Sequence, residues 1–153
     1  MVKSPFELEQ RARQIVLLLT DNDGVLTDTG VYYSGNGEEL KRYSVRDGMG
    51  VERLRKLAGV EVGIITGELS ASVERRAEKL NITELHLGIK DKMAVLHEIA
   101  ERNKLDLNQI AYIGDDTNDL EVMRAVGLSA CPQDAVTFAL DVADYICQCP
   151  GGH

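Results

Sequence analysis

The sequence of 153 residues has no tryptophan, only two phenylalanines and only three cysteines. Three cysteines cannot all pair, which argues against a disulfide scaffold and favours a reducing cytoplasm. Long apolar runs are missing too: none approaches the roughly 20 residues that a bilayer-spanning helix needs. The N-terminus, MVKSPFELEQRARQIV, lacks the basic-then-apolar order of a signal peptide. The sequence therefore predicts a cytoplasmic protein without a membrane segment.

Positive charge is also scarce. Lysine and arginine number 17 against 25 aspartates and glutamates, which gives a formal net charge of −8. A nucleic acid or an anionic membrane would require a basic footprint, so neither is expected as a partner. A protein of this charge that handles an anionic substrate must supply positive charge locally, from a metal ion or from a few placed lysines and arginines.

What the sequence does contain is a regular alternation of short apolar runs and segments with helical periodicity. This pattern is typical of the α/β class, with a mostly parallel sheet and crossover helices. We expect one domain, residues 1–153, large enough to bury its own core. The predicted strands are Ile15–Thr20, Val60–Thr66, Leu85–Leu87, Ile110–Ile113, Leu128–Ala130 and Tyr145–Cys147. The predicted helices are Gly48–Leu57, Ser70–Lys79, Lys92–Arg102, Asn118–Ala125 and Ala135–Leu140.

One segment breaks this alternation. Val31–Tyr33 and Leu40–Ser44 flank the stretch SGNGEE, in which Gly35 and Gly37 can supply the positive φ of a tight turn. The sequence therefore predicts a β-hairpin, over about residues 30–45, inserted after the first strand.

Polar residues follow four of the predicted strands. They are Asp21 and Asp23 after the first, Thr66 and Gly67 after the second, Lys92 just past the third, and Asp115 in GDDTND after the fourth. Ligands of open parallel α/β sheets bind beyond the carboxyl ends of the strands. Each of these short patterns alone is weak evidence, because turns and helix caps use the same residues. Their joint placement at one rim of the sheet predicts a functional site there.

These residue types suit phosphoryl transfer. Asp21, Asp23 and Asp115 form a hard-oxygen site of the kind that Mg²⁺ prefers. A carboxylate that touches phosphorus can act as nucleophile and form an aspartyl phosphate. The second aspartate can protonate the leaving oxygen and later take a proton from water. Thr66 and nearby backbone amides can bind phosphoryl oxygens, and Lys92 supplies positive charge.

At this point the chain resembles a known family. DNDGVLTD, IITGE, the DK pair at 91–92 and GDDTND match, in order, the four motifs of the haloacid dehalogenase superfamily. The hairpin and YSVRDGMG make the chain similar to the small phosphatases of that superfamily that act on eight-carbon octulosonate or nine-carbon sialic-acid-type phosphates. The resemblance runs from about Ile15 to Gly152. It implies a three-layer, Rossmann-like fold without a cap domain.

The resemblance also implies roles for individual residues. Asp21 would be the nucleophile and Asp23 the acid/base, with its backbone carbonyl on Mg²⁺; Asp115 would be the third protein ligand of the metal. Asp116 would support the metal side of the loop. The implied substrate contacts are Arg46, Asp47, Gly48, Gly67, Glu68, Arg76 and Asn118. In relatives of this type the hairpin packs against a neighbouring subunit, which implies a homotetramer.

The choice of substrate stays open. Octulosonate phosphatases usually carry an arginine directly after the TG of the second motif, and here the residue is Glu68. In this respect the chain is more similar to the nine-carbon group, whereas SVRDG is more similar to the eight-carbon group. A glutamate repels a substrate carboxylate that an arginine would hold. Arg46 would then hold that carboxylate, with Arg76 as the second candidate.

Two non-enzymatic functions are the alternatives to a phosphatase. A phosphate-accepting receiver domain also uses an acidic cluster, a threonine and a lysine, but its lysine comes last along the chain. Here Lys92 precedes GDD, which disfavours a receiver. A silent oligomerisation module is disfavoured because Asp21 and Asp23 are both present.

Overall fold

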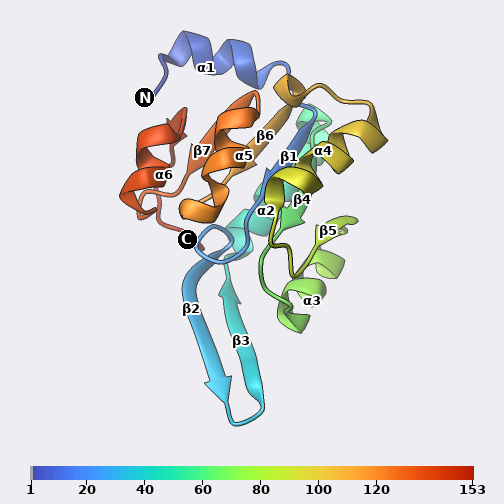
Figure 1. Ribbon diagram of the computed structural model, residues 1–153, viewed down its shortest axis with the longest axis vertical. Helices are drawn as coiled ribbons and strands as arrows, with labels where there is room; N and C mark the ends of the chain where they lie inside the picture. The colour runs from blue at the N-terminus through green and yellow to red at the C-terminus, as the bar shows by residue number, and fades with distance from the viewer. Residues whose placement is uncertain (1) are drawn as a thin grey trace.

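A computed structural model describes residues 2–153, apart from the side chain of Glu39. Its centre is a six-stranded sheet in the order β5-β4-β1-β6-β7-β8 (Figure 1). Every neighbouring pair of strands in this sheet is parallel, so the predicted α/β class is confirmed. The strands are β1 (Leu17–Thr20), β4 (Glu61–Ile65), β5 (Glu84–His86), β6 (Ile110–Ile113), β7 (Leu128–Cys131) and β8 (Tyr145–Ile146).

The strand β1 lies in the middle of the sheet because it is apolar on both faces. Side chains alternate along a strand, so Leu17 and Leu19 point to one face and Leu18 to the other. Leu17 and Leu19 belong to a large buried cluster with α4 (Lys92–Asn103), α5 (Leu120–Ala125) and α6 (Thr137–Val142). Leu18 packs against a second cluster with α2 (Val45–Arg53) and α3 (Ala71–Lys79). Helices thus cover both faces of the sheet, which makes the predicted three layers.

The helices follow local signals in the sequence. Ser70 caps α3 by accepting a hydrogen bond from the Val73 N–H, and Asp91 caps α4 in the same way through the Ala94 N–H. The helix α2 continues into one π-helical turn, η1 (Leu54–Ala58). Short 3₁₀ turns, η2 (Leu107–Gln109) and η3 (Thr117–Asp119), flank β6. Among residues 2–153 no helix is long and apolar enough to span a bilayer.

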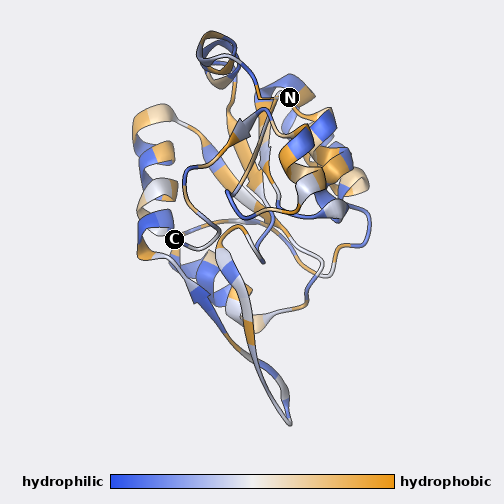
Figure 2. Ribbon diagram, turned by 90° about the vertical axis from the view of Figure 1, so that its left-hand side faces the viewer, coloured by the Kyte–Doolittle hydropathy of each residue, from blue (hydrophilic) through white to orange (hydrophobic). Residues whose placement is uncertain are grey.

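The helix α1 (Pro5–Ala12) was not predicted. It begins with a capping box in which Ser4 and Glu7 each accept a hydrogen bond from the other's backbone N–H. This helix buries no residue, so it has no core-facing apolar stripe of the kind that marks the other helices. Figure 2 shows the contrast between the apolar central strands and the mixed surface of the helices.

The inserted hairpin is confirmed. It consists of β2 (Thr27–Ser34) and β3 (Gly37–Tyr43), which pair in antiparallel fashion and project away from the central sheet (Figure 1). The strand β2 begins four residues earlier than the predicted Val31. Among the described residues no cap domain follows the hairpin, as expected.

Candidate active site

The loop after β1 folds tightly under the carboxyl ends of the strands. The Asp21 N–H donates to the Ile113 carbonyl at 2.9 Å, and the Asn22 carbonyl then accepts from Leu26 and Thr27. Gly24 lies in this turn with a φ of 85°. A Cβ at Gly24 would lie 2.0 Å from Asp115 Oδ2. Only glycine therefore lets the loop come this close to the carboxylate that follows the neighbouring strand β6.

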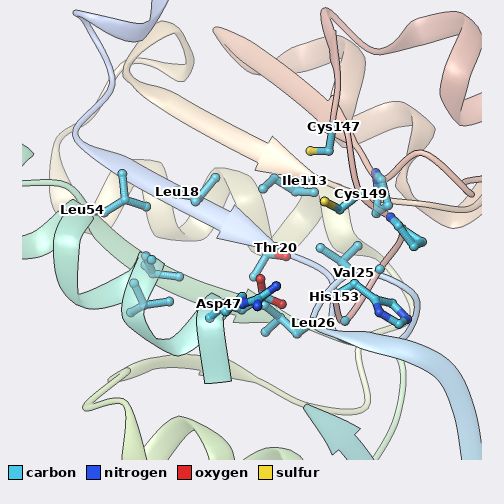
Figure 3. A pocket seen from close by; sticks show the side chains of 18 residues that line it. Leu18, Thr20, Val25, Leu26, Asp47, Leu54, Ile113, Cys147, Cys149 and His153 are labelled. Atoms are coloured by element: carbon cyan, nitrogen blue, oxygen red, sulfur yellow. The ribbon is translucent and has the colours of Figure 1, made fainter. Parts of the chain in front are cut away.

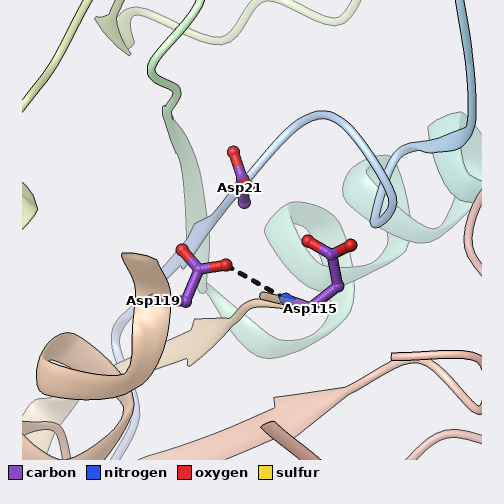
Figure 4. Close-up of side chains that lie close together, drawn as sticks. All are labelled: Asp21, Asp115 and Asp119. Atoms are coloured by element: carbon purple, nitrogen blue, oxygen red, sulfur yellow. Dashed lines mark hydrogen bonds between the residues drawn. The ribbon is translucent and has the colours of Figure 1, made fainter. Parts of the chain in front are cut away.

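Three carboxylates from two strand ends meet above this loop. One oxygen of each of Asp21, Asp115 and Asp119 lies within 4.8 Å of the others (Figure 4). Asp119 is fully buried, and its Oδ2 accepts from the Asp115 N–H at 3.0 Å and from the Asp116 N–H at 3.3 Å. Asp119 therefore shapes the loop that presents Asp115.

The buried ammonium of Lys92 balances part of this charge. Lys92 Nζ lies 2.7 Å from Asp119 Oδ1 and 3.2 Å from Asp21 Oδ1. The Tyr112 hydroxyl also donates to Asp119 Oδ1, at 2.6 Å. Asp21 Oδ1 accepts a second hydrogen bond from the Asn22 N–H at 2.7 Å. These contacts fix the Asp21 carboxylate through one oxygen, and Oδ2 takes part in neither of them.

One ammonium does not compensate three carboxylates. Burial raises the pKa of Asp21 to about 6, and the charge of Asp119 also raises it, while Lys92 lowers it. Burial, followed by the charges of Asp21 and Asp119, raises the pKa of Asp115 to about 7. Asp115 Oδ1 is buried without a hydrogen-bond partner among the described residues. A hard divalent cation with oxygen ligands fits this arrangement, because it would pair with that oxygen and offset the repulsion.

A polar cavity of about 240 Å³ opens beside these carboxylates. The Thr66 hydroxyl, at the end of β4, accepts from the Glu68 N–H at 3.3 Å and is buried. The residues that line the cavity are Asp21, Asp23, Thr29, Thr66, Gly67, Glu68, Asp115, Asp116 and Asn118. Asp21, Thr66 and Asp115, which the sequence placed at the ends of separate strands, therefore line a single cavity.

Other predicted substrate contacts lie elsewhere. Arg46 and Asp47 line a second, mainly apolar cavity of about 270 Å³ beside β1, α2 and the segment 147–153 (Figure 3). Arg76 donates to the Ser44 carbonyl at 2.7 Å and lies 5.2 Å above the ring of Tyr43. Gly48 packs under Arg76, because a Cβ there would lie 3.1 Å from Arg76 Nη2. The predicted substrate-binding residues are therefore divided between the two cavities and the contact of α3 with α2.

Beyond Asp119, to which the sequence assigned no role, sequence reasoning missed one further charged residue of the site. Lys41, on β3, has a side chain with no exposed surface and forms an ion pair with Asp23 at 2.7 Å. Burial alone would lower the pKa of Lys41, but its contacts with Asp23 and Glu38 outweigh burial and raise it. The stretch EELKR looks like an ordinary solvated strand face, so the sequence carried no signal for this contact.

The comparisons with known proteins agree with this geometry. The sequence model of the haloacid dehalogenase-like hydrolase family matches residues 76–150. Two relatives align with 94% and 93% of this chain. The aligned regions make up 76% and 75% of the relatives' own lengths. The chain belongs to the haloacid dehalogenase-like hydrolases.

The individual relatives are more specific. The chain is 43% identical over 143 residues to the 3-deoxy-D-manno-octulosonate 8-phosphate phosphatase KdsC of Yersinia pestis, covering 94% of this chain and 76% of the relative. The crystal structure of the Yersinia pestis phosphatase superposes with a TM-score of 0.91 over 95% of this chain and 78% of that one, at 42% identity. The phosphatase of the same name from Moraxella catarrhalis, in complex with a magnesium ion, a phosphate ion and a KDO molecule, is 35% identical. Its TM-score is 0.93 over 98% of this chain and 86% of that one.

Proposed function

We propose that this chain is an Mg²⁺-dependent phosphatase that hydrolyses the phosphate monoester of a small sugar acid. The first candidate substrate is 3-deoxy-D-manno-octulosonate 8-phosphate, which gives the free sugar acid and phosphate. The observation that carries the proposal is the approach of the Asp21 and Asp115 carboxylates to each other over the buried ammonium of Lys92. The phosphatases named in the comparisons support the reaction class and the substrate class.

The chain's own residues supply the chemistry. A carboxylate oxygen of Asp21 attacks phosphorus, and the bond from phosphorus to the sugar oxygen breaks as the aspartyl phosphate forms. Asp23 gives its proton to the leaving sugar oxygen, and then takes a proton from the water that attacks the aspartyl phosphate. That second attack releases phosphate and restores Asp21. The Thr66 hydroxyl, the backbone near Gly67 and the Lys92 ammonium bind the phosphoryl oxygens.

We further propose that Asp21, Asp115 and the Asp23 backbone carbonyl hold the magnesium ion, with Asp116 in support. When bound, the ion neutralises carboxylate and phosphoryl charge so that two anions can approach each other. Asp119 has both oxygens engaged by hydrogen-bond donors, so its role is to orient Lys92 and the Asp115 loop rather than to donate a further ligand.

A nine-carbon sialic-acid-type 9-phosphate is the second candidate substrate. The observation that favours it is Glu68, which lines the polar cavity directly after Gly67. A carboxylate there suits a hydroxyl-rich part of a substrate and repels a substrate carboxylate. Arg46 lines the other cavity, so within one chain it does not offset Glu68.

The deciding experiment compares turnover of octulosonate 8-phosphate, a nine-carbon 9-phosphate and an aryl phosphate by the purified protein with Mg²⁺. We expect one of the two sugar-acid phosphates to have a much higher kcat/KM than the aryl phosphate. Asp21→Asn is the control: it is nearly isosteric, so it should abolish turnover with little loss of stability. Wild-type rates in this variant would disprove the covalent mechanism, and equal kcat/KM for all three substrates would disprove the substrate class.

We also propose a homotetramer in which the hairpins pack between subunits, and a cytoplasmic location. The exposed hairpin side chains Tyr32 and Leu40 support the assembly, because they are cross-strand partners and exposed apolar groups that project together favour a protein contact. The few cysteines support the location.

A further inference from the structure

Lys41 connects the hairpin to the loop that carries the catalytic aspartates. Its ammonium lies 2.7 Å from Asp23 Oδ1 and 2.9 Å from Asp23 Oδ2, so it contacts both oxygens of the carboxylate. Asp23 is 18 residues earlier in the chain and belongs to a different element. A contact with both oxygens fixes the plane of the carboxylate as well as its position.

The other side of Lys41 is also held. Glu38 Oε2 lies 3.4 Å from Lys41 Nζ, and Glu38 Oε1 accepts hydrogen bonds from the hydroxyls of Ser70 and Ser72. Ser70 is the N-cap of α3 and lies three residues after Gly67. The ammonium is therefore fixed between the hairpin, the nucleophile loop and the start of α3, with its side chain fully shielded from solvent.

Lys41 does not touch the space where the reaction would occur. It is absent from the described residues that line the polar cavity, whereas Asp23 lines that cavity and its side chain is 26% exposed. A lysine that served only the stability of the hairpin would have no need to contact both oxygens of a cavity-lining carboxylate. Ion pairs on a protein surface contribute little to stability, and a buried lysine is costly unless it is well paired.

We propose that Lys41 is a positioning residue for Asp23: it holds the carboxyl group toward the oxygen that leaves phosphorus, and its ammonium stabilises the carboxylate that remains once the proton has been given to that oxygen. This inference rests on the proposed acid/base role of Asp23. The requirement is geometric, because general acid catalysis needs the proton donor within hydrogen-bond distance of the leaving oxygen in the transition state. A side chain free to rotate away from that oxygen loses most of this benefit, since small misplacements are expensive in rate.

The test is Lys41→Met, measured as kcat/KM with Mg²⁺ on phenyl phosphate and on 4-nitrophenyl phosphate. Phenolate is the poorer leaving group and depends more on protonation. We expect kcat/KM to fall about 10- to 100-fold for phenyl phosphate and less than about threefold for 4-nitrophenyl phosphate. Lys41→Arg should restore part of the loss, because it keeps the positive charge. The matched control is Arg42→Met: Arg42 is the next residue on β3, and it pairs with Asp28 at 2.7 Å rather than with Asp23.

A double-mutant cycle with Asp23→Asn separates positioning from a structural role. If Lys41 acts through Asp23, Lys41→Met should cost less than about twofold once Asp23 is already asparagine. Equal losses for both aryl phosphates, or the same loss in the Asp23→Asn background, would overturn the proposal. Full activity of Asp23→Asn itself would instead refute the proposed acid/base role. Should Lys41→Met fail to fold, Glu38→Gln replaces it, with a smaller loss and the same leaving-group pattern expected.

Discussion

The Asp115 carboxyl combines a buried oxygen that has no hydrogen-bond partner in the described chain with a pKa raised to about 7. In the unfolded chain the same group has an ordinary pKa near 3.8. The folded, metal-free protein therefore binds this proton more tightly than the unfolded chain does. The stability that this proton contributes is complete below pH 3.8 and is lost as the pH rises through about 7.

The direction of this pKa shift predicts how the stabilisation of the protein by magnesium depends on pH. If Asp21 and Asp115 hold the ion as proposed, protons compete with Mg²⁺ for these carboxylates, so Mg²⁺ should raise the melting temperature more at pH 8 than at pH 5. At a hundredfold excess over its Kd the ion contributes about 2.7 kcal/mol to the free energy of unfolding. Thermal unfolding followed by circular dichroism, with and without Mg²⁺, measures this directly.

Asp115→Asn is the matched variant for that measurement. The amide keeps the shape of the carboxyl and removes one of the repelling charges, so the metal-free variant should be at least as stable as the metal-free wild type at pH 8. The Mg²⁺-induced rise in melting temperature should disappear. A rise as large as in the wild type would show that Asp115 does not hold the ion.

Among the elements, the loop between β1 and β2 has a strict backbone requirement at one glycine. Gly24 adopts a φ of 85°, and a Cβ there would meet Asp115 Oδ2 at 2.0 Å. Gly24→Ala should therefore lower the free energy of unfolding by about 1–3 kcal/mol and weaken Mg²⁺ binding, since Asp115 must move. Denaturant unfolding and calorimetric titration with Mg²⁺ measure the two effects.

Gly50→Ala is the control for this substitution. Gly50 lies within α2, with open space where a Cβ would be placed. Alanine is the better helix former, so this change should add up to about 1 kcal/mol and leave Mg²⁺ binding unchanged. If both alanine variants behaved alike, the contact between Gly24 and Asp115 would not determine the loop geometry.

Most elements of the fold were predictable, because their signals are local. Apolar runs located the six strands of the central sheet, and the glycines of SGNGEE located the hairpin turn, although Gly37 adopts a positive φ and Gly35 does not. The helix α1 was missed, although Ser4, Pro5 and Glu7 form a recognisable helix start. The strand order and the π-helical turn after α2 had no local signal, since both depend on packing between distant segments.

The site was predictable in part for the same reason. Residues at the ends of strands are brought together by any parallel sheet, so the approach of Asp21, Thr66 and Asp115 to one cavity follows from the fold class. The contact between Lys41 and Asp23 depends on how the hairpin bends over the sheet. The placement of Arg46 in the other cavity likewise depends on where α2 starts.

At the scale of the whole molecule, the hairpin exposes apolar side chains far from the central sheet. Tyr32 and Leu40 are cross-strand partners and so lie on one face; they are 67% and 63% exposed. If this face packs between subunits, Tyr32→Asp together with Leu40→Asp should dissociate the proposed tetramer, because it would bury unpaired charge. Light scattering coupled to size-exclusion chromatography gives the molar mass.

Phe138→Asp provides the comparison. Phe138 is 63% exposed on α6, on a different element, so its substitution should leave the molar mass unchanged. A wild-type protein of monomer mass would refute the assembly, and a tetramer that survives both hairpin substitutions would place the contact on another surface.

The hairpin offers a surface, separate from the active site, through which a binding partner can change turnover. An isolated two-stranded ribbon is only marginally stable in water, so its conformation responds to whatever binds it. Lys41 and Glu38 are both part of this ribbon, and they reach Asp23 and the start of α3. A contact that shifts the ribbon, such as the packing of a neighbouring subunit against it, would therefore change turnover at a distance, and the ribbon tip shares no residue with the described lining of either cavity.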